Sequence, residues 1–358
     1  MRLTFVPGIG GERQRQLLAA FGPPEQIFGA SRNAIAGVIG AKLADALLTA
    51  PDEDRIDGAL AWADEAGNTI IPLGDPAYPA TLLEIPDPPV LLYVKGQLEL
   101  LRAPSVAMVG ARSSTPQGDA TASAFGKALS ESGLCIVSGL ASGIDAAAHR
   151  GALEGSGATI AVIGTGADRV YPARNRSLAQ RIAAAGTIVS EFPLGTPALA
   201  HNFPRRNRLI AGLALGVLVV EAAVDSGSLI TARLAADQGR EVFAIPGSIH
   251  SPLAKGCHRL IRQGAKLVET AADVLEELHW RARTTPPLVA PSPLADEAAQ
   301  AQGDTGKVLR ALGHDPLDMD TLAGRTGLTP EALYAILLAM ELDGRLARLP
   351  GNRVQRLS

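Results

Sequence analysis

Residues 134–145 read Leu-Cys-Ile-Val-Ser-Gly-Leu-Ala-Ser-Gly-Ile-Asp, which is a short apolar run, a turn rich in glycine and serine, and the beginning of a helix. The same order occurs earlier, where Ser105 to Val109 is followed by Gly110-Ala111-Arg112-Ser113. Short apolar runs that alternate with helical segments predict an α/β fold with a doubly wound, mostly parallel sheet of the extended Rossmann-like type. The other runs that we assign to strands are 90–94, 158–163, 187–189, 217–220, 241–245 and 265–268.

Two smaller domains are expected to flank this sheet. Residues 1–70 carry apolar residues at helical spacing and predict a small helical domain, similar to SAM or helix-hairpin-helix modules. Residues 71–282 are assigned to the sheet domain, with a Pro-rich connection between Ile70 and Gly96. Residues 283–303, rich in Pro, Ala, Thr and Gln, are typical of a linker. Residues 304–358 predict three helices and a strand pair, the order of a winged helix.

Composition and charge limit the classes of function that this protein can have. The 358 residues carry a net charge of −3, so nucleic-acid binding would depend on local patches. Two cysteines and the lack of a Cys/His cluster indicate a reducing compartment and no metal site. No apolar run is long enough to span a bilayer and no signal peptide is apparent, so we expect a cytoplasmic protein without membrane contact.

The turns that follow the predicted strands are rich in Gly and Ser. In doubly wound sheets, ligands bind at the carboxyl ends of the strands, and glycine lets backbone amides approach an oxyanion there. The sequence therefore predicts a phosphate-binding rim. Neither a dinucleotide fingerprint nor a Gly-Lys-Ser/Thr loop is present, which disfavours dinucleotide or ATP use. The turns are 110–113, 138–145, 164–168, 226–228 and 246–248.

A cluster of arginines follows within the same domain. Residues 203–209 read Phe-Pro-Arg-Arg-Asn-Arg-Leu, and no acidic residue occurs from Phe192 to Val220. Arginine forks fit phosphate oxygens, and the rings of Phe203 and His201 offer faces for a base. This favours a nucleic-acid backbone as ligand. The alternative is a helix N-terminus whose arginines pair with acids from elsewhere in the chain.

The last predicted helix, from Pro330 to Leu342, contains no Arg or Lys, so it does not support reading of base edges. A role in protein interaction is favoured for this domain. Its predicted wing has arginines that are able to contact phosphates, namely Arg345, Arg348, Arg353 and Arg356.

Several ordered blocks together resemble the DNA-processing protein A family (DprA/Smf) over essentially the whole chain. The blocks are Val106 to Arg112, Ser138 to Asp145 with His149, Tyr171-Pro172, Ser190-Glu191, Phe203 to Arg208, Val220 to Ala222, Ser226 to Ala232, Pro246-Gly247 and Gly264-Ala265. The resemblance implies a homodimeric recombination mediator, not an enzyme, that binds single-stranded DNA without sequence preference. It would protect incoming DNA and help to load RecA recombinase during natural transformation, the DNA uptake of competent cells.

The resemblance also implies site residues. Arg112 would hold a phosphate, Phe203 would contact a base, and 205–208 would line the same pocket. Some relatives have Lys where this chain has Ala200, a loss that other basic residues would have to offset. The expected DNA-binding residues are Gly110, Arg112, Ser138, Gly139, Gly164, Gly166, Phe203, Arg205, Arg206, Asn207, Arg208, Ser226, Gly227, Ser228 and Lys255, without a cofactor, metal ligand or catalytic residue. The expected dimer interface contains His258, Ile261 and Leu267.

The rival hypothesis is a nucleotide-processing enzyme, because a related sheet fold serves phosphoribohydrolases. Those enzymes place a catalytic carboxylate after a glycine-rich loop, and the corresponding stretch here, Ala232 to Ala235, has no acid. Glu221 remains a candidate general base; the other interpretation is that it anchors loop amides or an arginine. Ser138, Asp145 and His149 suggest a triad only weakly. Asp145 fits better as a residue at a helix N-terminus that accepts hydrogen bonds from loop amides.

Overall fold

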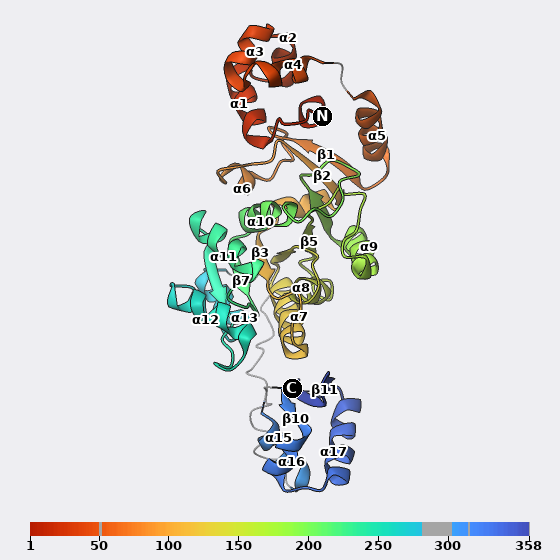
Figure 1. Cartoon of the computed structure of the whole chain (residues 1–358), viewed down its shortest axis with the longest axis vertical. Helices are drawn as coiled ribbons and strands as arrows, with labels where there is room; N and C mark the ends of the chain where they lie inside the picture. The colour runs from red at the N-terminus through yellow and green to blue at the C-terminus, as the bar shows by residue number, and fades with distance from the viewer. Residues whose placement is uncertain (50–51, 281–302, 314–315, 358) are drawn as a thin grey trace.

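The computed structural model describes residues 1–49, 52–280, 303–313 and 316–357. Figure 1 shows the N-terminal helices at one end of the long axis, a large sheet in the middle and a small C-terminal domain at the other end. The predicted linker, 283–303, lies outside the described residues except for Gly303. Within the described part of the chain, no helix is long and apolar enough to cross a membrane.

The central sheet has nine strands in the order β1-β2-β6-β5-β4-β3-β7-β8-β9. The seven strands from β6 to β9 in this order are parallel to one another. Strand β2 pairs antiparallel with both β6 and β1. The predicted doubly wound, mostly parallel sheet is therefore confirmed. Its elements are β1 (Asn68–Pro72), α6 (Ala80–Leu83), β2 (Leu91–Gly96), β3 (Ser105–Val109), α7 (Pro116–Glu131), β4 (Cys135–Ser138), α8 (Ile144–Ala152), β5 (Thr159–Val162), α9 (Arg176–Ala185), β6 (Thr187–Ser190), α10 (Asn202–Leu213), β7 (Gly216–Val219), α11 (Gly227–Asp237), β8 (Glu241–Ala244), α12 (Lys255–Arg262), β9 (Lys266–Leu267) and α13 (Ala271–Glu277).

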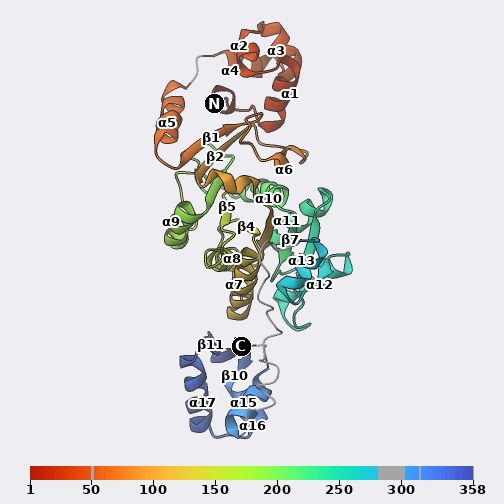
Figure 2. The same cartoon turned by 180° about the vertical axis from the view of Figure 1, so that it is seen from behind.

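Both faces of the sheet are buried, which explains why its strands read as continuous apolar runs. Successive side chains of a strand point to opposite faces. Val106 and Met108 of β3 pack with α7, α8 and α13, whereas Ala107 and Val109 pack with α6, α10, α11 and α12. Figures 1 and 2 show α7 and α8 on one side of the strands and α11 and α12 on the other.

The order of the strands creates one switch point, between β3 and β7. From β3 the chain adds β4, β5 and β6 on one side, then returns to add β7, β8 and β9 on the other. The loops that follow β3 and β7 therefore diverge in opposite directions and leave a crevice at their carboxyl ends. Val109, the last residue of β3, lies opposite Val219, the last residue of β7.

The segment before β2 differs from the sequence prediction. We expected a helical domain that ends at residue 70 and a Pro-rich connection to Gly96; instead, β1 begins at Asn68 and pairs with β2 at the edge of the sheet. The boundary thus runs through a strand. Its sequence, Asn-Thr-Ile-Ile-Pro, is short and ends in proline, so its pattern is weak. The predicted N-terminal helices are present as α1 (Gly11–Phe21), α2 (Pro24–Gly29), α3 (Arg32–Ile39), α4 (Ala41–Leu48) and α5 (Glu53–Asp64).

The C-terminal domain has the predicted three helices and strand pair, with one additional short strand. The Thr329 hydroxyl accepts a hydrogen bond from the amide of Ala332, and Pro330 begins the following helix, so the predicted N-cap is confirmed. The elements are α15 (Asp304–Leu312), β10 (Leu317–Asp318), α16 (Met319–Thr326), α17 (Pro330–Leu342), β11 (Leu346–Leu349) and β12 (Arg353–Arg356).

Helices α7 and α8 pack closely because glycines lie at their contact. A Cβ on Gly126 would lie 2.6 Å from the carbonyl oxygen of Ala148, and a Cβ on Gly151 would overlap the carbonyl oxygen of Ser123. This contact fixes the position of α8 and of the loop that precedes it.

Gly151→Ala is therefore expected to lower the free energy of unfolding by about 1–3 kcal/mol, the usual effect of overpacking. Helix propensity alone would act in the opposite direction, by about 1 kcal/mol. Gly58→Ala in α5 is the control, because Gly58 is exposed and a Cβ there would meet no atom within 4 Å. Urea denaturation monitored by circular dichroism measures both; equal effects of the two substitutions would contradict this packing argument.

Candidate nucleic-acid interface

A pocket of about 540 Å³ opens at the switch point of the sheet. Its walls come from the loop after β3, the loop after β7 and the beginnings of α10 and α11. The structure thus brings together several of the predicted residues, although the first and the last of them are more than a hundred positions apart in the sequence. Those that line the pocket are Gly110, Arg112, Phe203, Arg206, Asn207, Ser226, Gly227 and Ser228.

Arg112 is the exposed cation of this pocket. Its guanidinium carbon lies 5.4 Å from the centre of the Phe203 ring. Among the described residues, no carboxylate lies within 4 Å of the Arg112 guanidinium. Asp225 lies on the opposite wall, in the loop after β7. A solvent-facing guanidinium beside an aromatic ring is suited to hold a phosphate whose base lies on the ring.

Phe203 is held in place by the glycine turn after β5. A Cβ on Gly164 would lie 2.9 Å from Cδ1 of the Phe203 ring, so only glycine leaves room for the ring there. The preceding residue, Asn202, is buried and its side-chain amide donates to the carbonyl oxygen of Gly164 at 3.1 Å. The Phe203 ring therefore packs against the turn at Gly164 and remains partly exposed to solvent.

Arg206 lines the base of the pocket and is almost entirely buried. Only 4% of Arg206 is exposed, and its Nη1 donates to the carbonyl oxygens of Gly139, at 2.7 Å, and of Val162. Burial lowers the pKa of Arg206 to about 10, with Asp145 opposing the shift, so the guanidinium stays charged at neutral pH. Burial also raises the pKa of Asp145, whose carboxylate accepts from the amides of Gly139 and Ala141.

The other two arginines of the cluster pair with acids from outside it. The side chains of Arg205 and Arg208 contact the same carboxylate oxygen of Glu191, at 3.0 and 2.7 Å, and Arg208 also contacts Asp87 at 3.0 Å. Asp87 in turn pairs with Arg15 of α1. The alternative interpretation, arginines paired with acids elsewhere in the chain, is confirmed for both. The stretch without acidic residues, 192–220, begins directly after Glu191. Nothing in the sequence indicated that Asp87 would pair with Arg208.

Three further predicted residues have their polar atoms turned inward. The Ser138 hydroxyl donates to the carbonyl oxygen of Met108 at 2.6 Å, and the Gly166 amide donates to the carbonyl oxygen of Thr196 at 3.0 Å. The Gly139 amide donates to Asp145. The structure places these residues in the support of the loops. Lys255 is exposed at the start of α12, two residues after Leu253, which lines the pocket.

Comparison with known proteins shows the family of the chain. Residues 69–279 match the model of the DNA recombination-mediator protein A family, and residues 290–352 match the DprA winged helix domain. The chain belongs to the DNA recombination-mediator protein A family. It is 40% identical to Protein Smf of Escherichia coli over 301 residues, which cover 84% of this chain and 80% of that protein. It is 52% identical to DNA processing protein DprA of Streptococcus pneumoniae over 206 residues, or 58% and 73% of the two chains.

Two solved structures of DNA processing protein A are similar. The structure from Streptococcus pneumoniae has a TM-score of 0.69 and 41% identity, over 75% of this chain and 94% of that one. The structure from Helicobacter pylori, described for its single-stranded DNA binding mode, has a TM-score of 0.54 and 29% identity, over 59% of this chain and 95% of that one.

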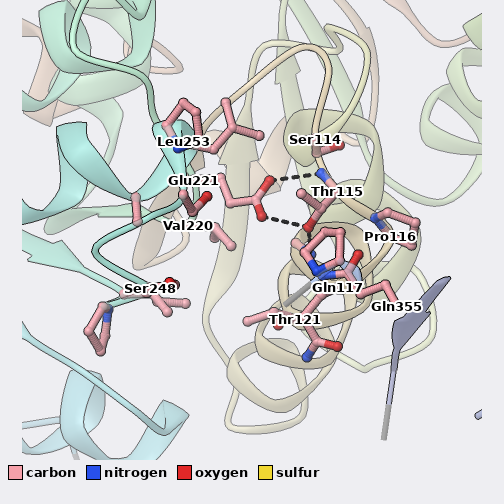
Figure 3. Close-up of a pocket in the computed structure, with 18 of the residues that line it drawn as sticks. Ser114, Thr115, Pro116, Gln117, Thr121, Val220, Glu221, Ser248, Leu253 and Gln355 are labelled. Atoms are coloured by element: carbon pink, nitrogen blue, oxygen red, sulfur yellow. Dashed lines mark hydrogen bonds between the residues drawn. The ribbon is translucent and has the colours of Figure 1, made fainter. Parts of the chain in front are cut away.

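Glu221 supports the loop after β3. Its two carboxylate oxygens accept from the amide of Thr115 at 2.9 Å and from the Thr115 hydroxyl at 2.7 Å, as Figure 3 shows. The interpretation of Glu221 as an anchor for a loop amide is confirmed. It also lines a larger hollow, of about 830 Å³, between α7, the loop at 245–254 and the winged helix domain. That hollow combines Glu221 and Glu269 with Arg353, whereas the pocket beside Arg112 has two arginines and the Phe203 ring, so the pocket suits a nucleotide of a polyanion better.

Asp145 and His149 do not form a catalytic triad. Asp145 accepts from two loop amides, as the sequence suggested, and His149 is fully buried. Nδ1 of His149 lies 2.7 Å from the hydroxyl of Thr159, which donates its own proton to the carbonyl oxygen of Ile136. Nδ1 therefore carries the imidazole proton. Burial, helped by nearby Arg206, lowers the pKa of His149 to about 3.

This buried imidazole predicts a pH dependence of stability. Because the folded pKa, about 3, lies below the value of 6.5 for an unperturbed histidine, the unfolded chain takes up the proton first as the pH falls. The contribution of the neutral His149 imidazole to the free energy of unfolding is fully present above pH 6.5. It decreases by about 1.4 kcal/mol per pH unit as the pH falls from 6.5 toward 3. Between pH 7 and pH 5, the wild type should lose about 2 kcal/mol more than His149→Gln.

Denaturant titrations at pH 7 and pH 5 measure this difference. His250→Gln, in an exposed loop, is the matched control and should follow the wild type. An identical pH dependence of wild type and His149→Gln would show that the imidazole is not held neutral.

Proposed function

We propose that this protein binds single-stranded DNA at the pocket between β3 and β7, without reading its sequence and without catalysing a reaction. The observation that carries the proposal is the pairing of exposed Arg112 with the supported ring of Phe203. One group is suited to a phosphate and the other to a base, so together they fit a nucleotide of a polymer. The single-stranded DNA binding mode described for the Helicobacter pylori relative supports this choice of ligand.

The opposite wall supplies neutral donors for the same strand. Helix α11 begins at Gly227, which is exposed. The Ser226 hydroxyl already accepts from the Ser228 amide at 3.3 Å, so the Gly227 amide is the donor that this helix N-terminus offers to a phosphate. The hydroxyls of Ser226 and Ser228 lie 2.7 Å apart in the same turn. Asn207 reaches across from α10, and its side-chain amide lies 3.4 Å from the carbonyl oxygen of Gly227. Such groups bind phosphate oxygens equally well whatever base is attached.

Among the predicted arginines, we assign the phosphate contacts to Arg112 and Arg205. Arg205 retains 45% side-chain exposure although one of its nitrogens contacts Glu191. Arg206 and Arg208 are buried, and we propose that they shape the pocket from below. Lys255 is proposed as a peripheral contact in place of the cation that is missing at Ala200.

Arg112→Ala is expected to weaken binding of poly-dT by about 10- to 100-fold, the range for loss of a charged hydrogen bond of ~1.5–3 kcal/mol. The slope of log affinity against log salt should become less negative by about 0.7, the value for one phosphate of a single strand. Fluorescence anisotropy across a salt series, with single-stranded and duplex oligonucleotides, measures both quantities. Duplex is expected to bind more weakly, because its bases are stacked and not available to Phe203.

Lys127→Ala provides the control for removal of one positive charge. Lys127 lies near the carboxyl end of α7, at the opposite end of the strands, where it is paired with Glu154. The proposal fails if Arg112→Ala binds like Lys127→Ala, or if the wild type binds duplex as tightly as single strands.

We further propose that the protein acts as a homodimer that protects incoming DNA and helps to load RecA recombinase onto it during natural transformation. Membership of a family described as recombination mediators supports this role. For the dimer, β9 is the edge strand of the sheet in the described part of the chain, beside β8, and Leu267 on it is 43% exposed. His258 and Ile261, the other predicted interface residues, are half-buried on the adjacent α12. Two linked sites would increase the affinity for long strands.

Leu267→Glu is expected to convert the dimer to a monomer in light scattering, because a charge would have to be buried in the interface. It should also lower the stimulation of RecA ATP hydrolysis on DNA coated with single-strand-binding protein, while binding of short oligonucleotides is retained. A wild type that is monomeric, or that does not stimulate RecA, would contradict this part of the proposal and leave DNA binding itself untouched.

A further inference from the structure

A second aromatic ring lies beside Phe203, outside the residues already assigned to the pocket. The centre of the Tyr171 ring is 5.6 Å from the centre of the Phe203 ring, and the two planes are inclined by 40°. Tyr171 is 50% exposed, so much of the ring that lies beside Phe203 faces solvent. Among the described residues, its hydroxyl makes no hydrogen bond, so neither polar satisfaction nor core packing explains the position of the ring.

The loop that carries Tyr171 is fixed on both sides of it. Before Tyr171, the Thr165 hydroxyl donates to the carbonyl oxygen of Arg169 at 3.0 Å. After it, the side-chain amide of Asn175 donates to the carbonyl oxygens of Leu140 and Ala141, at 2.9 and 3.1 Å. The exposed ring therefore does not belong to a loose loop. An exposed aromatic ring held in this way is pre-organised for a ligand.

Positive charge accompanies the ring. Arg174 is exposed, and its Nε donates to the Ser142 hydroxyl at 2.8 Å, which directs the guanidinium toward the loop after β4. Arg176, at the start of α9, is exposed as well. In the described part of the chain, no carboxylate lies within 4 Å of either guanidinium. Both are therefore available to an anion.

We propose that Tyr171 is a second base-stacking residue and that Arg174 holds a phosphate of the nucleotide bound there. The DNA path would then extend from the β3/β7 pocket, across Phe203, to the loop after β5. This inference rests on the proposed binding of single-stranded DNA and names a further subsite for it. Two consecutive unstacked bases and the phosphate between them are the ligand that this arrangement recognises.

The ring geometry decides how the bases are arranged. A base inserted between two rings needs them about 7 Å apart, twice the ~3.4 Å rise per base of stacked DNA. The Tyr171 and Phe203 centres are only 5.6 Å apart. A base therefore does not fit between them, and each ring offers its outward face to a base of its own.

Photo-crosslinking of oligo-dT that contains 5-iodouracil, followed by mass spectrometry, tests this directly, because iodouracil crosslinks to aromatic side chains that it stacks on. Crosslinks are expected at both Phe203 and Tyr171 of the full-length protein. Tyr171→Ala should weaken binding of oligo-dT in anisotropy by roughly 5- to 100-fold, the range for loss of one base–aromatic stack. Tyr171→Phe, which keeps the ring, should bind like the wild type.

Arg174→Ala should make the salt slope less negative by about 0.7, as expected for one phosphate of a single strand, while Lys127→Ala leaves it unchanged. Crosslinks at Phe203 but none at Tyr171, with wild-type affinity of Tyr171→Ala, would overturn the second subsite and leave the proposed function standing. Crosslinks that avoid both rings would overturn the proposed function itself. Circular dichroism of each variant separates loss of binding from loss of folding.

Discussion

One buried guanidinium holds together the loops that form the pocket between β3 and β7. Arg206 projects from α10 and donates to carbonyl oxygens just after β4 and in β5, and the charge of Asp145 opposes the lowering of its pKa. A charge with 4% exposure is stable only where carbonyl oxygens and an opposite charge replace its water. The same contact sets the height of α10 above the sheet and therefore the place of Phe203. Replacing Gly139 by any larger residue would bring a Cβ into the guanidinium, so arginine and glycine depend on each other.

The arginine-rich stretch thus contains two kinds of arginine. Helical spacing turns Arg206 toward the sheet, and the carboxylates of Glu191 and Asp87 hold Arg208 inside. Arg205 faces outward, and Arg112 approaches from another loop. Much of the positive charge is used to hold the helix, and the part that faces solvent is small. This division is consistent with a net charge of −3, because strong binding of a polyanion through bulk charge is not available to this chain.

The sequence was sufficient for the strand and helix alternation, since buried parallel strands and glycine turns leave local patterns. It also identified the turns of the rim and the internal role of Asp145. It was not sufficient for β1, whose Pro72 and two polar residues resemble a connection. Ion pairs such as that between Arg208 and Asp87 join residues 121 positions apart, and no periodicity reports such contacts. Tyr171 was recognised as part of a block, but its closeness to Phe203 depends on how two loops meet.

The strand order has a consequence for how the site comes into existence. The loops that carry Arg112 and Ser226 follow adjacent strands of the sheet, β3 and β7. Along the chain, however, the three strands β4, β5 and β6 and their helices lie between β3 and β7. During synthesis, β3 is made long before β7, so the edge of β3 that pairs with β7 stays unpaired until β7 has been made. Until β7 inserts beside it, the chain has half a crevice and an open sheet edge. Insertion of β7 and formation of the pocket are therefore one event, so a chain that has been made only as far as β6 lacks the proposed DNA site.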